Sequence, residues 1–234
     1  AGYDALEDEV RTLHEDVAGR VHVAAIYSVG LHHMSRHVQE FMTRHPKANI
    51  RLEYLHPERV LTLVEEGQAD VGIVSYPRST RAVSAMAWRE ERIVVACAPN
   101  HPFADRIEIS ISDLEGQRVV GFDSDLVIRH ELDRVIASHS VTPKIVMEFD
   151  NIETIKRGVE IDAGVALLPE PTVSREVAAG TLRAVKVSDE KLVRPLGIVQ
   201  ARNKPLGPTA RRFVDMLHEH ADDAVEECAV MASA

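Results

Sequence analysis

Residues 144–169 read KIVMEFDNIETIKRGVEIDAGVALLP, and this stretch decides the fold class. Its first six residues, 144–149, have the composition of a strand, and residues 165–168 form a second, wholly apolar one. Between them Asn151 stands where a helix N-cap is expected, and residues 151–160 carry the apolar spacing of a helix. A strand, a helix and a strand joined by short connections predict two strands of one parallel sheet, linked by a right-handed crossover.

The same alternation of strand and helix extends over most of the chain, which predicts an α/β protein with two βαβ-rich halves. The turn cluster Pro99-Asn100-His101-Pro102 lies between the halves and marks an expected boundary. In the first half we expect strands at 20–26, 49–55 and 71–75, helices at 30–44 and from Pro57 to Gly67, and a strand-rich segment at 82–98. In the second half we expect strands at 118–122, 144–149, 165–168, 182–187 and 192–200, and helices at 126–138, 151–160, 172–179 and after 205–209.

Composition narrows the class of protein. The chain has 234 residues, of which 27 are basic and 37 acidic, so its formal net charge is −10, and a nucleic-acid-binding surface is disfavoured. Cys97 and Cys228 have neither the spacing of a disulfide framework nor that of a zinc site. No apolar run approaches the roughly 18 residues that span a bilayer, and no signal peptide is recognised. We therefore expect a cytoplasmic protein without a membrane segment.

The N-terminal segment has a narrow apolar stripe. Leu6, Val10, Leu13 and Val17 are spaced by four, three and four residues, and nearly all residues between them are charged or polar. This spacing fits the seam of a coiled coil and equally fits an amphipathic helix that lies on its own domain. Both interpretations stay open.

Several motifs in the second half point to one family. They are Phe149-Asp150-Asn151-Ile152-Glu153-Thr154-Ile155-Lys156, the run Val165-Ala166-Leu167-Leu168-Pro169, and the segment Glu176–Leu182 that ends in Gly-Thr-Leu. Their order resembles the effector-binding domain of LysR-type transcriptional regulators. Three further segments agree with the resemblance, which extends from about Leu6 to His218: residues 19–24, 65–73 and 93–102. The chain departs from the commoner pattern at Asp162, where a second small residue is frequent, so the geometry of that turn is left open.

The resemblance implies a two-lobe fold like that of periplasmic binding proteins of type 2, with a central cleft and two crossover strands. It divides the chain into the end of a linker helix at 1–18, lobe I at 19–97 and 198–219, lobe II at 98–197, and a tail at 220–234. The family's N-terminal DNA-binding domain, a winged helix-turn-helix, is expected to be absent from this chain.

The resemblance places the candidate ligand-binding residues in the cleft. Those of lobe I are Ser28, Val29, Ser75, Tyr76 and Arg78, and those of lobe II are Ala98, Phe122, Ser124, Asn151 and Pro169. The Ser28 hydroxyl and the first amides of its helix could hold an anion. Each polar residue also has a simpler interpretation, because Ser28, Ser124 and Asn151 could only cap helices and Arg78 could be a solvated surface charge.

No catalytic motif or cofactor signature is present, so we predict neither an enzyme nor a cofactor. His33 and His37 are four residues apart on a predicted helix, but two histidines without a third fixed ligand do not make a metal site, and none is predicted.

The leading hypothesis is therefore a ligand-sensing regulatory domain that binds a small polar or anionic effector between two lobes. It would form a dimer, or a tetramer, and reach DNA only through the missing winged helix-turn-helix, without a membrane partner. The alternative is the solute-binding protein of a transport system, which shares the implied fold.

Overall fold

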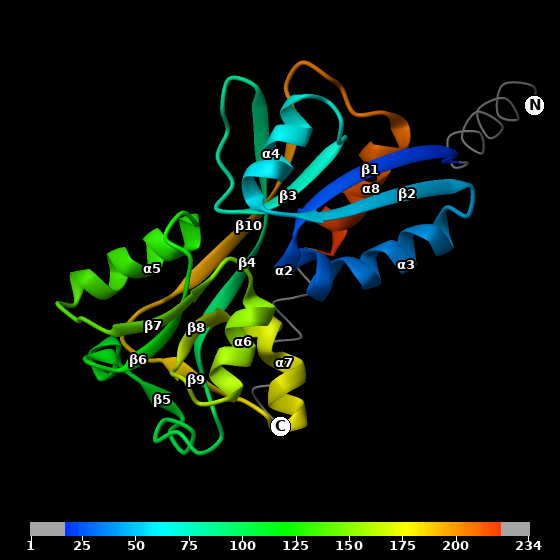
Figure 1. Cartoon of the computed structure of the whole chain (residues 1–234). Coiled ribbons are helices and arrows are strands. Elements are labelled where there is room, and N and C mark those ends of the chain that lie inside the picture. Colours follow the sequence, from blue (N-terminus) through cyan, green and yellow to red (C-terminus); the bar gives the residue numbers. More distant parts are fainter. Residues whose placement is uncertain (1–16, 221–234) are drawn as a thin grey trace, which may run out of the picture. The chain divides into compact units, whose positions relative to one another are not determined.

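The computed structural model of the chain describes residues 17–220, and Figure 1 shows their helices and strands. The chain divides into two compact units, of which unit 1 combines the residues up to Arg89 with those from Gly197 onward, and unit 2 is Glu90–Leu196. The two boundaries lie inside the strands β4 (Val83–Cys97) and β10 (Val193–Ala201). The first boundary falls earlier than the expected one at Cys97, because the second half of β4 pairs with strands of unit 2.

Unit 1 is built on a parallel sheet. The strands β1 (Gly19–Ile26), β2 (Ala48–Leu55) and β3 (Val71–Ser75) follow the order β2-β1-β3, and β10 and β4 continue that order. Parallel pairing of β1 with both neighbours is what the right-handed crossover rule requires. Its helices are α2 (Tyr27–Val29), a π-helical turn Gly30–Met34, α3 (Ser35–Arg44), α4 (Pro57–Glu65) and α8 (Pro208–Glu219).

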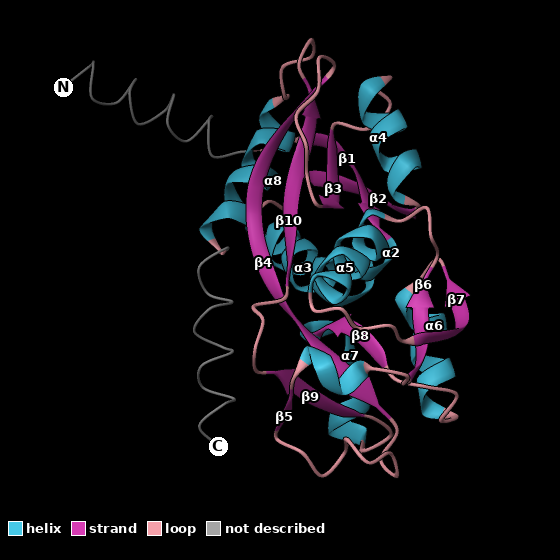
Figure 2. Cartoon of the chain, turned by 90° about the vertical axis from the view of Figure 1, so that its left-hand side faces the viewer, coloured by secondary structure: helices cyan, strands magenta, loops and turns pink. Residues whose placement is uncertain are grey.

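Helices cover both faces of this sheet. Figure 2 shows α4 on one face and α3 with α8 on the other. Residues 21–26 of β1 are accordingly buried without a break, as expected of a strand with both faces covered. Gly72 of β3 permits this close packing, since a Cβ there would lie 2.6 Å from Val199 and 2.9 Å from Val64 of α4.

Unit 2 contains two sets of strands. β6 (Arg118–Phe122) pairs in parallel with β7 (Lys144–Phe149), while β8 (Ala166–Pro169) and β9 (Arg183–Val187) both pair antiparallel with β4. A short strand β5 (Glu108–Ile109) runs parallel to β9. Its helices are α5 (Val127–Ser138), α6 (Ile152–Glu160), α7 (Glu170–Ala179) and a 3-10 turn at Ile111–Leu114.

The turn before β8 is tight. Asp162 has a φ of 58°, and Asp is one of the few non-glycine residues that adopt this left-handed conformation readily. Two residues later, a Cβ on Gly164 would lie 2.5 Å from the backbone oxygen of Arg118. Glycine at this position is therefore required by the close approach of β6.

The expected elements are present, with shifts at their ends. The helix predicted at 172–179 begins at Glu170, because Pro171 fits the first turn of a helix, where its missing N–H is not needed. β5 was not expected, since two residues carry no periodic signal. Most of the predicted linker helix and the tail from residue 221 lie outside the described residues. Within the described part, no helix is long and apolar enough to cross a membrane.

Candidate functional site

The first candidate loop of unit 1 begins a helix directly after β1. Helix α2 starts at Tyr27, its N-cap is Ile26, and no side chain caps it. Ser28 lies inside the first turn, so the interpretation of Ser28 as a helix cap is wrong. Val29 is fully buried, backbone included, so it presents no exposed surface at this edge.

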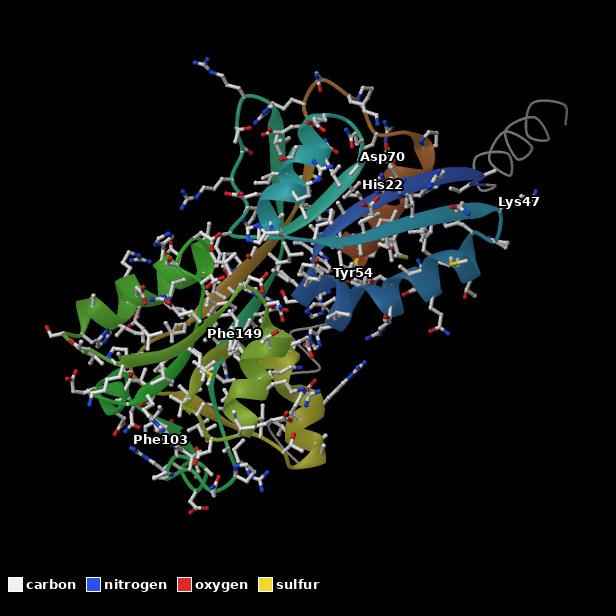
Figure 3. The ribbon with its side chains drawn as sticks, in the orientation of Figure 1. His22, Lys47, Tyr54, Asp70, Phe103 and Phe149 are labelled. Atoms are coloured by element: carbon white, nitrogen blue, oxygen red, sulfur yellow. The ribbon has the colours of Figure 1, made fainter. Side chains whose placement is uncertain are left out.

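This helix start lies close to the neighbouring strand. A Cβ on Gly30 would lie 2.2 Å from the ring of Tyr54 on β2, the residue labelled in Figure 3. The chain then passes through the π-helical turn. Such turns are rare in proteins, but those that occur are often at functional sites. Gly30 thus lets the helix start lie directly beside β2.

The second candidate loop follows β3. Ser75 is the last residue of that strand, and within residues 17–220 its hydroxyl makes no hydrogen bond. Tyr76 has a φ of 50°, a left-handed conformation that costs a bulky residue free energy, and such strained residues cluster at functional sites. Gly197 accommodates the loop, because a Cβ there would be 2.4 Å from Pro77.

The two loops share one edge of the sheet of unit 1. β1 and β3 are parallel neighbours in the register Ala25↔Ile73, so the carboxyl ends of the two strands lie side by side. Ser28 lies two residues beyond Ile26, the last residue of β1, and Ser75 is the last residue of β3. The carboxyl edge of a parallel sheet is where open α/β folds bind ligands, and the structure brings both serines to it.

Three strands of unit 2 also end at a common edge. β6 and β7 pair at Phe122↔Phe149, and a parallel bridge joins Val119 to Val165, just before β8. The amide of Asp123 donates to the carbonyl oxygen of Phe149 at 2.9 Å, which fixes the loop after β6. Phe149 is labelled in Figure 3.

The candidate residues of this edge differ in role. Ser124 does not cap α5, because the N-cap is Leu126; its hydroxyl is exposed and has no hydrogen-bond partner in the described part of the chain. Asn151 is a cap, as one interpretation expected, since its side-chain oxygen accepts from the Thr154 amide at 3.0 Å. Its amide nitrogen donates to Asp150 at 2.9 Å, which leaves one N–H for another acceptor.

Pro169 and Ala98 lie at opposite ends of the β4–β8 pair. Pro169 ends β8 opposite Ile93, whereas Ala98 follows Cys97, beyond the pair Ala96↔Ala166. Phe122, Pro169 and Ala98 are all buried. The structure therefore brings Phe122, Asn151 and Pro169 together and does not bring Ala98 to them.

A buried lysine that sequence reasoning did not select holds α6 and α7 together. The Lys156 ammonium donates to the Glu176 carboxylate at 2.8 Å and to the Thr172 carbonyl at 3.0 Å, and lies 3.0 Å from the Glu153 carboxylate. The Lys156 side chain is only 3% exposed. Its position four residues after Ile152, on the apolar face of α6, is a signal that could have identified it.

The two edges differ in charge. Arg78 is exposed in the loop after β3 of unit 1. Four carboxylates follow the strand ends of unit 2, close to the beginnings of α5, α6 and α7: Asp123, Asp125, Asp150 and Glu170. An anionic group on a ligand is therefore better matched by the edge of unit 1.

The histidines on α3 form contacts within unit 1. His37 is buried beside Trp88, and burial, together with the nearby Arg89 charge, lowers its pKa to about 4. The Arg89 guanidinium lies 3.3 Å from Nδ1 of His33. Among residues 17–220 no group of three or more metal-ligating side chains is placed to hold an ion.

The buried thiol does not suggest a catalytic nucleophile. Cys97 has no exposed surface, and burial raises its pKa to about 11, so it stays protonated at neutral pH.

Comparison with known proteins agrees with this geometry. Residues 14–222 match the family described as the LysR substrate binding domain. The chain is 25% identical over 207 residues to the HTH-type transcriptional regulator YeiE of Escherichia coli K12, which covers 88% of this chain and 70% of YeiE.

Solved structures share the fold at low sequence identity. The effector binding domain of QuiR in complex with shikimate gives a TM-score of 0.79 at 19% identity, covering 88% of this chain and 99% of that one. The regulatory domain of CcmR from Synechocystis PCC6803 in complex with 2-PG gives a TM-score of 0.78 at 21% identity, and the match covers 87% of this chain and 97% of the CcmR domain.

The fold is a mixed α/β fold of the periplasmic-binding-protein type 2, and the class is that of effector-binding regulatory domains rather than enzymes. The chain belongs to the LysR substrate binding domain family, the effector-binding domain of LysR-type transcriptional regulators.

Proposed function

We propose that this chain senses a small polar or anionic effector that residues of both units hold. In unit 1 the ligand would meet the Ser28 hydroxyl, the first amides of the helix that starts at Tyr27, and Ser75. In unit 2 it would meet Ser124 and the free N–H of Asn151. The proposal rests on one observation above all: Ser28 follows the end of β1, Ser75 is the last residue of the neighbouring parallel strand β3, and neither serves as a helix cap.

The charge of the two edges orients the ligand. A carboxylate or other anionic group would lie at unit 1, where helix amides and Arg78 favour negative charge. Hydroxyl or amine groups of the ligand would lie at unit 2, where Asp123, Asp150 and Glu170 offer acceptors. The effector is thus expected to carry its negative charge at one end only.

Ligand binding would reach DNA by conformational coupling. An effector shifts an equilibrium only as far as it binds the two conformations with different affinity. The change would pass through the N-terminal linker to winged helix-turn-helix modules outside this chain, in a cytoplasmic dimer or tetramer. A solute-binding protein of a transporter shares the fold, but membership of a regulator family favours the sensor.

Thermal-shift screening of small organic acids and inorganic anions tests the proposal. A ligand that stabilises the wild type should bind Ser28→Ala and Ser75→Ala a few-fold to roughly a hundredfold more weakly, because each hydroxyl contributes about 0.5–3 kcal/mol depending on the charge of its partner. Ser138→Ala is the matched control and should leave affinity unchanged, because the Ser138 hydroxyl donates to Val135 of its own helix at 2.7 Å and otherwise lies 3.3 Å from Nδ1 of the adjacent His139. Equal stabilisation of the wild type and both serine variants would place the ligand elsewhere and contradict the proposal.

A further inference from the structure

Gly30 is an unfavourable choice of residue for its position in unit 1. It lies inside the continuous helical stretch 27–44, between α2 and α3, and its φ of −56° and ψ of −48° are those of an ordinary right-handed helix. Residues with side chains adopt these angles readily, so the backbone does not require glycine here. Glycine inside a helix is less favourable than alanine, because it loses more conformational freedom on folding. The reason for glycine at this position must therefore lie in a neighbouring side chain.

The neighbouring side chain is that of Tyr54 on β2, labelled in Figure 3. A Cβ on Gly30 would lie less than 3.0 Å from each of Cγ, Cδ1 and Cε1 of the Tyr54 ring, which is closer than real Cβ atoms approach. The ring thus occupies the space in which any other residue would carry its Cβ. Within residues 17–220 the Tyr54 hydroxyl makes no hydrogen bond, so Tyr54 acts on this helix through its ring.

This contact lies at the edge of the sheet where the proposed effector residues of unit 1 gather. Tyr54 is in register with Ala25 and is the last residue but one of β2, and Gly30 follows Ser28 by two residues. β1 is the parallel neighbour of both β2 and β3. Tyr54 therefore belongs to the same carboxyl edge as Ser28 and Ser75.

The helix turn that carries Ser28 has few other restraints. No side chain caps α2, and its closing hydrogen bond runs from the Gly30 amide to the Tyr27 carbonyl oxygen. The π-helical turn Gly30–Met34 follows directly, so the i→i−4 hydrogen-bond pattern of α3 is interrupted before it reaches the first turn. A further contact is needed to fix the orientation of residues 27–29, and the Tyr54 ring provides it.

We infer that Tyr54 is a positioning residue of the effector site: its ring, received by Gly30, fixes the helix turn that presents Ser28. The inference rests on the proposed function, in which the Ser28 hydroxyl and the amides of this turn meet the ligand. Tyr54 does not have to touch the effector itself. A turn that is already ordered loses little conformational entropy when a ligand binds, and in this way the contact raises affinity.

A double-mutant cycle tests the contact between Gly30 and Tyr54. Gly30→Ala should lower the melting temperature of the wild type and of Tyr54→Phe, which keeps the ring, but should not lower that of Tyr54→Ala, in which the ring is gone. Gly207→Ala is the matched control, since a Cβ there would have no atom within 4 Å, and its effect should be the same in all three backgrounds. The inference is wrong if Gly30→Ala leaves the melting temperature of the wild type unchanged, or lowers that of Tyr54→Ala by the same amount.

NMR order parameters of the backbone amides, measured without ligand, test the positioning role. A rigid backbone has an order parameter of about 0.85 and a flexible one a value below about 0.6. Ser28 should be rigid in the wild type and in Tyr54→Phe and flexible in Tyr54→Ala, with Ser75 rigid in all three; Tyr54→Leu replaces Tyr54→Ala if the latter does not fold. A purely structural role would lower the melting temperature without loosening this turn alone, so an unchanged order parameter at Ser28 would overturn the inference.

Titration with inorganic phosphate separates this inference from the proposed function. Phosphate should shift the Ser28 amide resonance of the wild type and bind roughly fivefold more weakly to Tyr54→Ala and to Ser28→Ala. The double variant should bind it no more weakly than the weaker single variant, because Tyr54 acts through the turn of Ser28. Equal affinity of the wild type and Tyr54→Ala would contradict the inference. If phosphate leaves the wild-type Ser28 resonance unchanged while Ser28 becomes flexible in Tyr54→Ala, the proposed anion site fails and the positioning role stands.

Discussion

Replacing Lys156 with methionine should destabilise unit 2 strongly. The side chains of Lys156 and Glu176 are 3% and 13% exposed, and among residues 17–220 the buried Oε2 of Glu176 has no hydrogen-bond partner. Removal of the ammonium leaves the Glu176 carboxylate without its buried counter-charge, and breaking a buried pair in this way costs about 3–5 kcal/mol. The Thr172 carbonyl also loses its bond to Lys156.

The double variant separates charge from packing. In Lys156→Met/Glu176→Met the isolated carboxylate is gone, so the free energy of unfolding should fall by only about 1–2 kcal/mol, chiefly for the lost bond to Thr172. The exposed pair Arg134–Glu131, with side chains 73% and 29% exposed, supplies the control, and Arg134→Met should cost less than about 1 kcal/mol.

Urea unfolding followed by far-ultraviolet circular dichroism measures these differences. The single tryptophan, Trp88, lies in unit 1, so its fluorescence reports separately on the unit that the substitutions do not touch. The reasoning is refuted if Lys156→Met costs less than about 1 kcal/mol. It also fails if the double variant loses as much as the two single variants together, since the two side chains would then not interact.

Two further outcomes are expected. The folded-state pKa of His37 is about 4 and its ordinary value 6.5, so the unfolded chain binds a proton that the folded chain does not; stability should rise as pH increases through this interval. Urea titrations from pH 4.5 to 7.5 give the free energy of unfolding at each pH, and this free energy should rise less steeply with pH in His37→Gln than in the wild type, by up to about 1.4 kcal/mol per pH unit. An equal pH dependence in both proteins would contradict the burial of a neutral imidazole. The chain should also self-associate through the stripe that includes Leu13, so sedimentation at tens of micromolar should show a dimer for the wild type and a monomer for Leu13→Asp; a monomeric wild type would contradict this.

The sequence predicted most of the fold because its signals are local. Asn151 capped a helix as expected, and the alternation of apolar runs with helical spacing located the strands of both sheets. The sequence did not predict the short strand β5, because its two residues form a strand only through their pairing with β9. The end of lobe I was expected at Cys97 because the turn cluster follows it, whereas the unit boundary at Arg89 depends on which strands pair with β4.

The candidate site was predictable only in part. The order of strands and helices along the chain shows which loops follow the strands, so Ser28 and Ser75 could be selected as candidate ligand-binding residues from the sequence. Whether Ser28 caps its helix depends on where the helix begins, and Ile26 takes the cap position. The distance of Ala98 from Pro169 depends on the antiparallel register of β4 and β8, and the role of Lys156 depends on α7 lying beside α6. These are tertiary relations that no local pattern contains.

The most direct test of effector sensing is a map of amide chemical-shift changes, recorded by NMR on this chain with a stabilising small acid from the screen. We predict the largest changes at Tyr27–Gly30 and Ser75–Arg78, with further changes at Ser124 and Asn151. Changes confined to other surfaces of either unit, with these loops unaffected at saturating ligand, would contradict the assignment of the effector site.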